Sequence, residues 1–148
     1  MNSEHEKYMR IALLEAQKAL DKDEVPIGAI VVCAGKIIGR GHNQTEMLND
    51  VTAHAEMLAI TAAENYLGAK YLKDCTLYVS LEPCVMCAGA LAWSQISNVV
   101  YGASDSKRGF LKHGKEILHP KTNIIGGILV EECGDILTDF FVKKRKSL

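Results

Sequence analysis

The sequence has no long apolar run, no excess of charge and no internal repeat. No stretch stays apolar over the ~20 residues that a membrane-spanning helix needs, so we expect no membrane association. The first ten residues, MNSEHEKYMR, are polar and mixed in charge, unlike a secretory signal peptide. A formal net charge of -1 excludes a generally basic protein that coats nucleic acid, so any such contact needs a local basic patch.

Length and cysteine content indicate one compact domain with reduced thiols. The 148 residues are 48% hydrophobic and 24% charged, an ordinary globular composition that can form a core without disulfides. We therefore expect residues 1–148 to form a single domain. The five cysteines are an odd number, and only Cys84 and Cys87 form a tight motif. Without a predicted secretion signal, we expect a cytoplasmic protein, where a C-x-x-C pair indicates metal or redox chemistry.

Hydrophobic periodicity predicts four helices and five strands. Helices are expected in the first segment up to Val25-Pro26, over 53–65 with Thr52 as N-cap, over 84–94 with Pro83 at the start, and over 131–146. β-rich runs predict strands at 27–33, 36–43, 75–81, 98–101 and 124–130. The segments 44–52 and 102–123 are predicted as loops, the second with a short helix.

This order of elements predicts an α/β protein with three layers, α/β/α, around a five-stranded mixed sheet. The turn Ala34-Gly35 joins the first two strands into an antiparallel hairpin. The later β-α-β units favour parallel pairing through right-handed crossovers. Gly39 and Gly41 in the second strand indicate a bend or the close approach of another backbone.

Three residues near predicted helix starts form a candidate zinc site. Cys84 and Cys87 are three residues apart, so they face the same way on a helix. The positive end of a helix dipole lowers thiol pKa and favours the thiolate that zinc requires. His54 adds a nitrogen ligand, and three protein ligands leave a fourth tetrahedral position for water, which is the catalytic zinc pattern. Zinc brings the pKa of that water toward ~7.

Glu56 lies two residues after His54 and is the candidate proton carrier. A carboxylate beside an activated water can take its proton, pass it to a ring nitrogen and assist the departing amine. The alternatives for the cysteines are a redox pair or a closed structural zinc site with His42 or His113 as fourth ligand, but neither histidine has finger-like spacing. The alternative for Glu56 is an ordinary solvated helix residue.

The combination of H-x-E with P-C-x-x-C is the signature of zinc deaminases. On His54, Glu56, Cys84 and Cys87 the chain resembles the cytidine-deaminase-like superfamily. Further segments resemble its tRNA adenosine deaminase branch in bacteria, and they extend along nearly the whole chain: VPIGAIVV (25–32), GRGHN (39–43), TAHAEMLAI (52–60), TLYVSLEPCVMCAGAL (76–91), VVYGASDSKRG (99–109) and DFFVKKRK (139–146).

The resemblance implies a Zn²⁺ enzyme that hydrolyses adenosine to inosine at the first anticodon position of a tRNA, with an arginine tRNA as the expected substrate. It also implies a cytidine-deaminase-like fold and a homodimer that binds the anticodon stem-loop across a groove near the subunit boundary. A base is attacked only when it is out of its stack, which a splayed loop nucleotide satisfies. The zinc motif alone is shared with free-base enzymes such as guanine deaminase, so this remains the alternative function.

The resemblance also assigns substrate contacts. Asn43 matches an asparagine that contacts the base, with a simple turn residue as the alternative. Positions that shape the base site match Ile27, Ala55 and Pro83. Asp105 and Lys107 match a D-x-K segment beside the substrate strand, with ordinary loop polarity as the alternative. His42 and the segment 47–50 depart from the family pattern, which affects the pocket edge and the loop contacts with RNA.

Two basic segments are candidate phosphate contacts. One is the predicted loop with Lys107, Arg108, Lys112 and Lys115, and the other is 143–146 at the end of the last helix. A solvated helix end favoured by the dipole is the alternative for the second segment. Of Phe140 and Phe141, we expect at least one to pack in the core, which leaves the other to stack on a base. A protein of another class, an inactive RNA-binding module with structural zinc, would not need Glu56.

Overall fold

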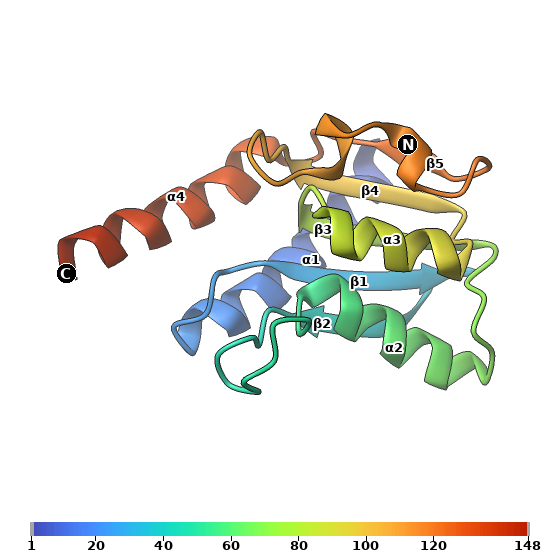
Figure 1. Cartoon of the computed structure of the whole chain (residues 1–148), viewed down its shortest axis with the longest axis horizontal. Coiled ribbons are helices and arrows are strands. Elements are labelled where there is room, and N and C mark those ends of the chain that lie inside the picture. The colour runs from blue at the N-terminus through green and yellow to red at the C-terminus, as the bar shows by residue number, and fades with distance from the viewer. Residues whose placement is uncertain (1, 148) are drawn as a thin grey trace.

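The computed structural model describes residues 2–147, which form five strands, four α-helices and two short 3₁₀ helices (Figure 1). In chain order the elements are α1 (Asn2–Asp21), β1 (Gly28–Cys33), β2 (Lys36–His42), α2 (Ala55–Leu67), β3 (Cys75–Leu81), α3 (Val85–Ser94), β4 (Asn98–Ala103), η1 (Phe110–Lys112), η2 (Lys115–Ile117), β5 (Asn123–Ile125) and α4 (Val130–Ser147). Among these described residues, no helix is both long and apolar enough to cross a membrane.

The strands form one mixed sheet in the order β2-β1-β3-β4-β5. β1 pairs antiparallel with both β2 and β3, whereas β3, β4 and β5 run parallel. Helices α2 and α3 lie side by side on one face, and α1 lies behind the sheet (Figure 1). Each face has its own apolar core, one under α2 and α3 and one between the sheet, α1 and the start of α4. The predicted three-layer α/β/α fold is confirmed.

Two glycines of β2 let α2 approach the sheet closely. A Cβ on Gly39 would lie 2.4 Å from the Ala59 carbonyl oxygen, and one on Gly41 would lie 2.3 Å from the Ala55 carbonyl oxygen. Any side chain at either position would therefore push the helix outward. The sequence-based expectation of a close backbone approach is confirmed, and its partner is the helix that follows His54.

The predicted helix starts differ from the structure by one or two residues. Thr52 is not the N-cap of α2, because its backbone N–H and its hydroxyl both bond to the Asp50 carboxylate, at 2.8 and 2.7 Å. The N-cap is His54, in an extended conformation, and the helix begins at Ala55. Pro83 likewise lies one residue outside α3, whose N-cap is Cys84.

The last strand is shorter than predicted and the second loop is more structured. β5 covers only Asn123–Ile125, because Gly126 and Gly127 turn the chain away from the sheet. Gly127 has a positive φ of 83° and donates its N–H to the Gly102 carbonyl. The predicted loop 102–123 contains the end of β4 and two 3₁₀ helices rather than one short helix. At the end of the chain, Phe140 is buried and Phe141 is half exposed, as the helical spacing predicted for one of the pair.

Candidate metal centre and its cavity

Two parallel helix starts bring the three candidate ligands together. α2 and α3 begin at the same end of the sheet, after β2 and β3 respectively (Figure 1). His54 and Cys84 are the N-caps of these helices, and Cys87 lies in the first turn of α3. The pleat of the sheet and the close contact of α2 with β2 therefore fix the separation of the imidazole from the two thiols.

The distances between the ligand atoms suit a tetrahedral zinc ion. The Nδ1 atom of His54 lies 3.6 Å from the Sγ atoms of both Cys84 and Cys87. Bonds of about 2.0 Å to nitrogen and about 2.3 Å to sulfur, at the tetrahedral angle, place nitrogen and sulfur about 3.5 Å apart. All three ligand atoms lie within 4.8 Å of one another. The soft S₂N donor set and its spacing therefore fit Zn²⁺.

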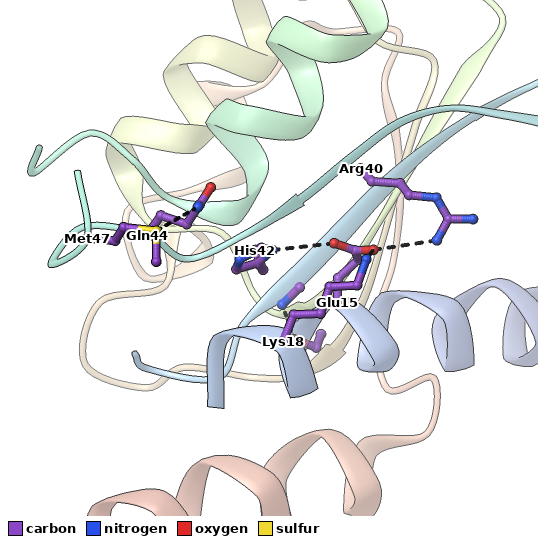
Figure 2. A network of polar contacts seen from close by, with 8 residues as sticks. Glu15, Lys18, Arg40, His42, Gln44 and Met47 are labelled. Atoms are coloured by element: carbon purple, nitrogen blue, oxygen red, sulfur yellow. Dashed lines mark hydrogen bonds and ion pairs between the residues drawn. The ribbon is translucent and has the colours of Figure 1, made fainter. Parts of the chain in front are cut away.

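Among the described residues, one cluster of side chains could bind a metal ion in this way, and it consists of His54, Cys84 and Cys87. Neither His42 nor His113 belongs to it. The ring of His42 faces the other side of the sheet, where its Nδ1 atom lies 3.5 Å from Glu15 (Figure 2). The structure thus gives no support to a closed, four-ligand structural site with either histidine, and the arrangement is that of a zinc site with an open position.

The network around Glu15 explains why His42 is held away from the candidate metal site. The buried Glu15 carboxylate also pairs with Lys18 at 2.8 Å and Arg40 at 3.5 Å, which joins α1 to β2 (Figure 2). Burial opposes ionisation of Glu15, but its basic partners outweigh that effect and lower its pKa. His42 therefore contributes to packing of α1 on the sheet.

The electrostatics of the thiols favour ionisation of Cys84 first. A hydrogen bond with Cys87, reinforced by His54, lowers the pKa of Cys84 to about 4 despite its partial burial. The hydrogen bond with Cys84 and burial then raise the pKa of Cys87, and the charges of Glu56 and Cys84 add to this effect. The hydrogen bond with Cys84 raises the pKa of His54 above its ordinary value. A divalent cation offsets the repulsion between two thiolates, which is what this cluster requires to release its protons.

Glu56 lies in the first turn of α2 and is only 4% exposed. Burial is the largest cause that raises the pKa of its carboxyl to about 7. A carboxyl group with such a pKa both accepts and donates a proton near neutral pH. The structure therefore does not support the alternative of an ordinary solvated helix residue.

A cavity of about 540 Å³ lies over these groups. His54, Glu56 and Cys84 form part of its wall, and the segment 104–108 forms another. Glu82 and five apolar side chains complete it, the latter being Val25, Ile27, Leu81, Leu137 and Phe141. A smaller cavity of about 260 Å³ shares Val25, Ile27 and His54 with it and extends to Asn43, Thr45 and Ala55. Partly apolar walls with a few polar groups are typical of a site that holds a planar base.

The residues predicted to touch substrate lie in different places around these cavities. Ile27 lines both cavities, and Asp105 and Lys107 line the larger one. Asn43 and Ala55 line the smaller one. Pro83 lines neither, because it is buried behind Cys84, where its carbonyl accepts the Phe110 N–H at 2.9 Å.

Two of these polar side chains also hold the local backbone. Asn43 donates from Nδ2 to the Val25 carbonyl and accepts the Thr45 N–H, both at 3.3 Å. The Asp105 carboxylate accepts the N–H groups of Lys107 and Arg108, at 3.1 and 3.0 Å. The turn role considered for Asn43 is therefore present in the structure, and an amide side chain keeps further donor and acceptor capacity for a ligand.

Sequence analysis missed two buried carboxylates that border the site. Glu24 is 2% exposed and accepts the N–H groups of Glu46 and Met47, at 3.1 and 2.7 Å. Glu82 is 5% exposed and accepts N–H groups from the loop after β4. For Glu82, the sequence did contain a signal of burial. This glutamate stands directly between a buried strand and the Pro83-Cys84 motif, where a solvated side chain is not expected.

The two basic segments differ in their surroundings. Lys107 and Arg108 line the larger cavity, next to the candidate metal ligands. Lys112 and Lys115 follow in the exposed 3₁₀ helices. On α4, Lys144 forms an ion pair with Asp23, and Phe141 of the same helix lines the cavity. Of the two basic segments, only the first therefore contributes charged side chains to the cavity wall.

Comparison with known proteins agrees with this geometry. Residues 2–103 match the cytidine and deoxycytidylate deaminase zinc-binding region. The tRNA-specific adenosine deaminase of Aquifex aeolicus is 44% identical over 147 residues, with 97% of each chain covered. A solved structure from studies of A-to-I editing by tRNA:A34 deaminases at the wobble position of transfer RNA is 41% identical, with a TM-score of 0.83 over 88% of this chain and 99% of that chain.

Guanine deaminases are also similar, but they match either a smaller part of this chain or the chain at lower identity. The guanine deaminase from Bacillus subtilis is 42% identical with a TM-score of 0.65, over 68% of this chain and 64% of that chain. The tRNA-specific relative matches 97% of this chain, which extends the similarity into the parts that form β5 and α4. The chain therefore belongs to the cytidine and deoxycytidylate deaminase zinc-binding family and, within it, to the tRNA-specific adenosine deaminases.

Proposed function

We propose that this protein is a zinc-dependent hydrolytic deaminase that converts adenosine to inosine at the wobble position of a tRNA. The observation that carries the proposal is the three-ligand group of His54, Cys84 and Cys87, which opens onto the same cavity as Glu56. Full-length similarity to tRNA-specific adenosine deaminases supports the substrate class.

Each member of the site has a distinct part in the reaction. His54, Cys84 and Cys87 hold the zinc ion, which supplies a Lewis acid that activates water at neutral pH. Glu56 accepts a proton from the attacking water and delivers it to the neighbouring ring nitrogen of adenine. After the C6–O bond has formed, Glu56 takes the remaining proton from that oxygen and delivers it to the amine, which leaves as ammonia when the C6–N bond breaks. The balance is adenosine plus water to inosine plus ammonia.

The cavity walls are proposed to select and hold the base. Ile27 and Ala55 contribute apolar surface close to His54, and Pro83 shapes the site from behind Cys84. Asn43 supplies a polar edge in the smaller cavity, with its remaining hydrogen-bonding capacity directed to the base. A flipped base is recognised by such a combination of apolar faces and edge hydrogen bonds.

We propose that the anticodon stem-loop binds along the wall formed by residues 104–108. Lys107 and Arg108 lie there and carry charges that suit the phosphates on either side of the base. The exposed ring of Phe141 lies on the same cavity, where it can stack on a neighbouring base. A tRNA substrate and unpaired thiols at all five cysteines are consistent with a cytoplasmic location.

We also propose a homodimer formed through the exposed side of α2 and α3. Trp93 on α3 is 84% exposed and borders a groove of about 330 Å³ between the two helices. Met57, Ile60 and Tyr71 also line that groove. An exposed tryptophan beside an apolar groove marks a protein interface, and a second copy of the chain offers the same complementary surface. Residues 1–148 then act as one deaminase domain per subunit.

The test offers two substrates to one sample of purified protein with measured zinc content. An anticodon stem-loop with adenosine at the wobble position should yield inosine, whereas free guanine should yield no xanthine. Removal of zinc by a chelator should stop turnover, and added zinc should restore it. Turnover of guanine with none of the RNA would overturn the proposal in favour of a guanine deaminase.

A further inference from the structure

The loop that forms one wall of the cavity is bonded near both of its ends to one buried carboxylate, that of Glu82. We propose that Glu82 is a positioning residue that holds residues 104–111 against the metal-binding helix and so sets the geometry in which RNA is bound. This inference rests on the proposed function, because Glu82 would affect the binding of RNA by holding the loop in place.

Glu82 anchors this loop at two separate points. Its Oε1 atom accepts the Asp105 N–H and its Oε2 atom accepts the Leu111 N–H, each at 3.0 Å. The carboxylate is 5% exposed, so both bonds are shielded from water. The backbone N–H of Glu82 itself donates to the Ala103 carbonyl at 2.8 Å. One side chain therefore fixes the start and the end of the loop to the chain just after β3.

The middle of the loop is packed against the same carboxylate and against the metal ligand. A Cβ at Gly109 would lie 2.1 Å from Oε2 of Glu82, so this glycine permits the close approach. Gly109 also forms an isolated antiparallel bridge with Cys84, and the Phe110 N–H donates to the Pro83 carbonyl at 2.9 Å. The loop is thus tied to the backbone that carries the first cysteine ligand.

Asp105 connects Glu82 to the two basic residues of the cavity wall, Lys107 and Arg108. Glu82 fixes the Asp105 backbone, and the Asp105 carboxylate in turn accepts the N–H groups of Lys107 and Arg108. The Gly109 N–H donates to the Asp105 carbonyl at 2.9 Å. These bonds close a tight turn whose two basic side chains line the cavity. Glu82 itself lines the cavity, and each of its oxygens accepts a backbone N–H of the loop, so we assign it a positioning role exerted through the loop.

Glu82→Gln is the informative change. The amide keeps one acceptor oxygen, but it presents an NH₂ donor to either Asp105 N–H or Leu111 N–H, so one anchor is lost. We expect backbone amides 105–111 to exchange hydrogen faster while zinc content stays at the wild-type value. With the wall loosened, KM for the stem-loop should rise about tenfold and kcat should change by less than about threefold.

Two matched variants separate this effect from general damage. Glu24→Gln makes the same change in a buried carboxylate with two backbone donors, but it should speed exchange at residues 46–47 and leave 105–111 protected. Glu116→Gln removes an exposed charge near the loop and should leave exchange and kinetics unchanged. If Glu82→Gln does not fold, Gly109→Ala, which keeps the carboxylate and crowds the loop, should give the same two effects.

The outcomes are distinguishable from failure of the proposed function. Unchanged exchange at 105–111 in Glu82→Gln would overturn the inference, as would faster exchange with unchanged KM. Loss of zinc in step with lost turnover would also overturn it, because Glu82 would then support the metal ligands. If wild-type protein does not deaminate the stem-loop, the proposed function fails, while the exchange measurements still decide whether Glu82 fixes the loop.

Discussion

Glu56→Gln is expected to abolish turnover and, at the same time, to stabilise the zinc-stripped protein. Burial raises the pKa of Glu56 to about 7 from an ordinary value of 4.5. Since each pKa unit corresponds to about 1.36 kcal/mol, the folded state disfavours the charged carboxylate by about 3 kcal/mol. Glutamine has nearly the same shape as the protonated acid and carries no charge at any pH.

The sign and the pH range of this effect follow from linkage. Below pH 4.5 the carboxyl is protonated in both the folded and unfolded states, so it imposes no penalty. Between pH 4.5 and about 7 the unfolded chain releases the proton more readily, and the penalty grows. Above pH 7 it is complete, at about 3 kcal/mol. The advantage of Glu56→Gln should therefore be small at pH 5 and largest at pH 8.

Urea unfolding of both zinc-stripped proteins at pH 5, 6, 7 and 8 measures this difference directly. The Glu116→Gln variant is the control, because it makes the same change at an exposed glutamate. A difference in free energy of unfolding between wild type and Glu56→Gln that stays constant from pH 5 to 8 would refute the reasoning. Zinc-loaded Glu56→Gln should retain its metal and lose 10²-fold or more of kcat, roughly the contribution of a general acid–base group.

Three further outcomes follow from the packing and charges. Gly41→Ala places a Cβ 2.3 Å from the Ala55 carbonyl oxygen and should lower the free energy of unfolding by about 1–3 kcal/mol, measured in urea. Lys107→Gln should reduce the slope of log affinity against log salt for the stem-loop by about one, and an unchanged slope would exclude a phosphate contact. Trp93→Glu should convert the dimer to monomer in sedimentation analysis, whereas an unaffected dimer would place the interface elsewhere.

Local patterns in the sequence were sufficient to predict the three layers of the fold and the three metal ligands. Helical spacing located the helices and β-rich runs located the strands, because the helices bury one face in a core and the central strands bury both. The ligand set followed from residue type and spacing, since few side chains bind zinc. The helix start at His54 was missed because Thr52 is a good N-cap by type, yet its hydroxyl is taken by Asp50. Such local competition between acceptors is not visible in a periodic pattern.

Sequence patterns could not predict the long-range polar contacts. Glu82 and Glu24 each bond backbone N–H groups more than 20 positions away in the chain, and nothing in their own segments indicates those partners. Glycines such as Gly109 signal close approach, but they do not identify the neighbour. The shape of the cavity depends on these contacts, so the sequence predicted its chemistry better than its walls.

The starts of α2 and α3 have a consequence for how the protein folds. Ordinary helices begin with a serine, threonine, aspartate or asparagine whose oxygen satisfies a free backbone N–H. Here the two N-cap positions are occupied by His54 and Cys84, and neither side chain makes a capping hydrogen bond. A zinc ion bound to both residues would link the starts of α2 and α3 to each other. Metal binding should therefore add to the stability of the folded protein, because the ligands come together only when both helices are packed on the sheet.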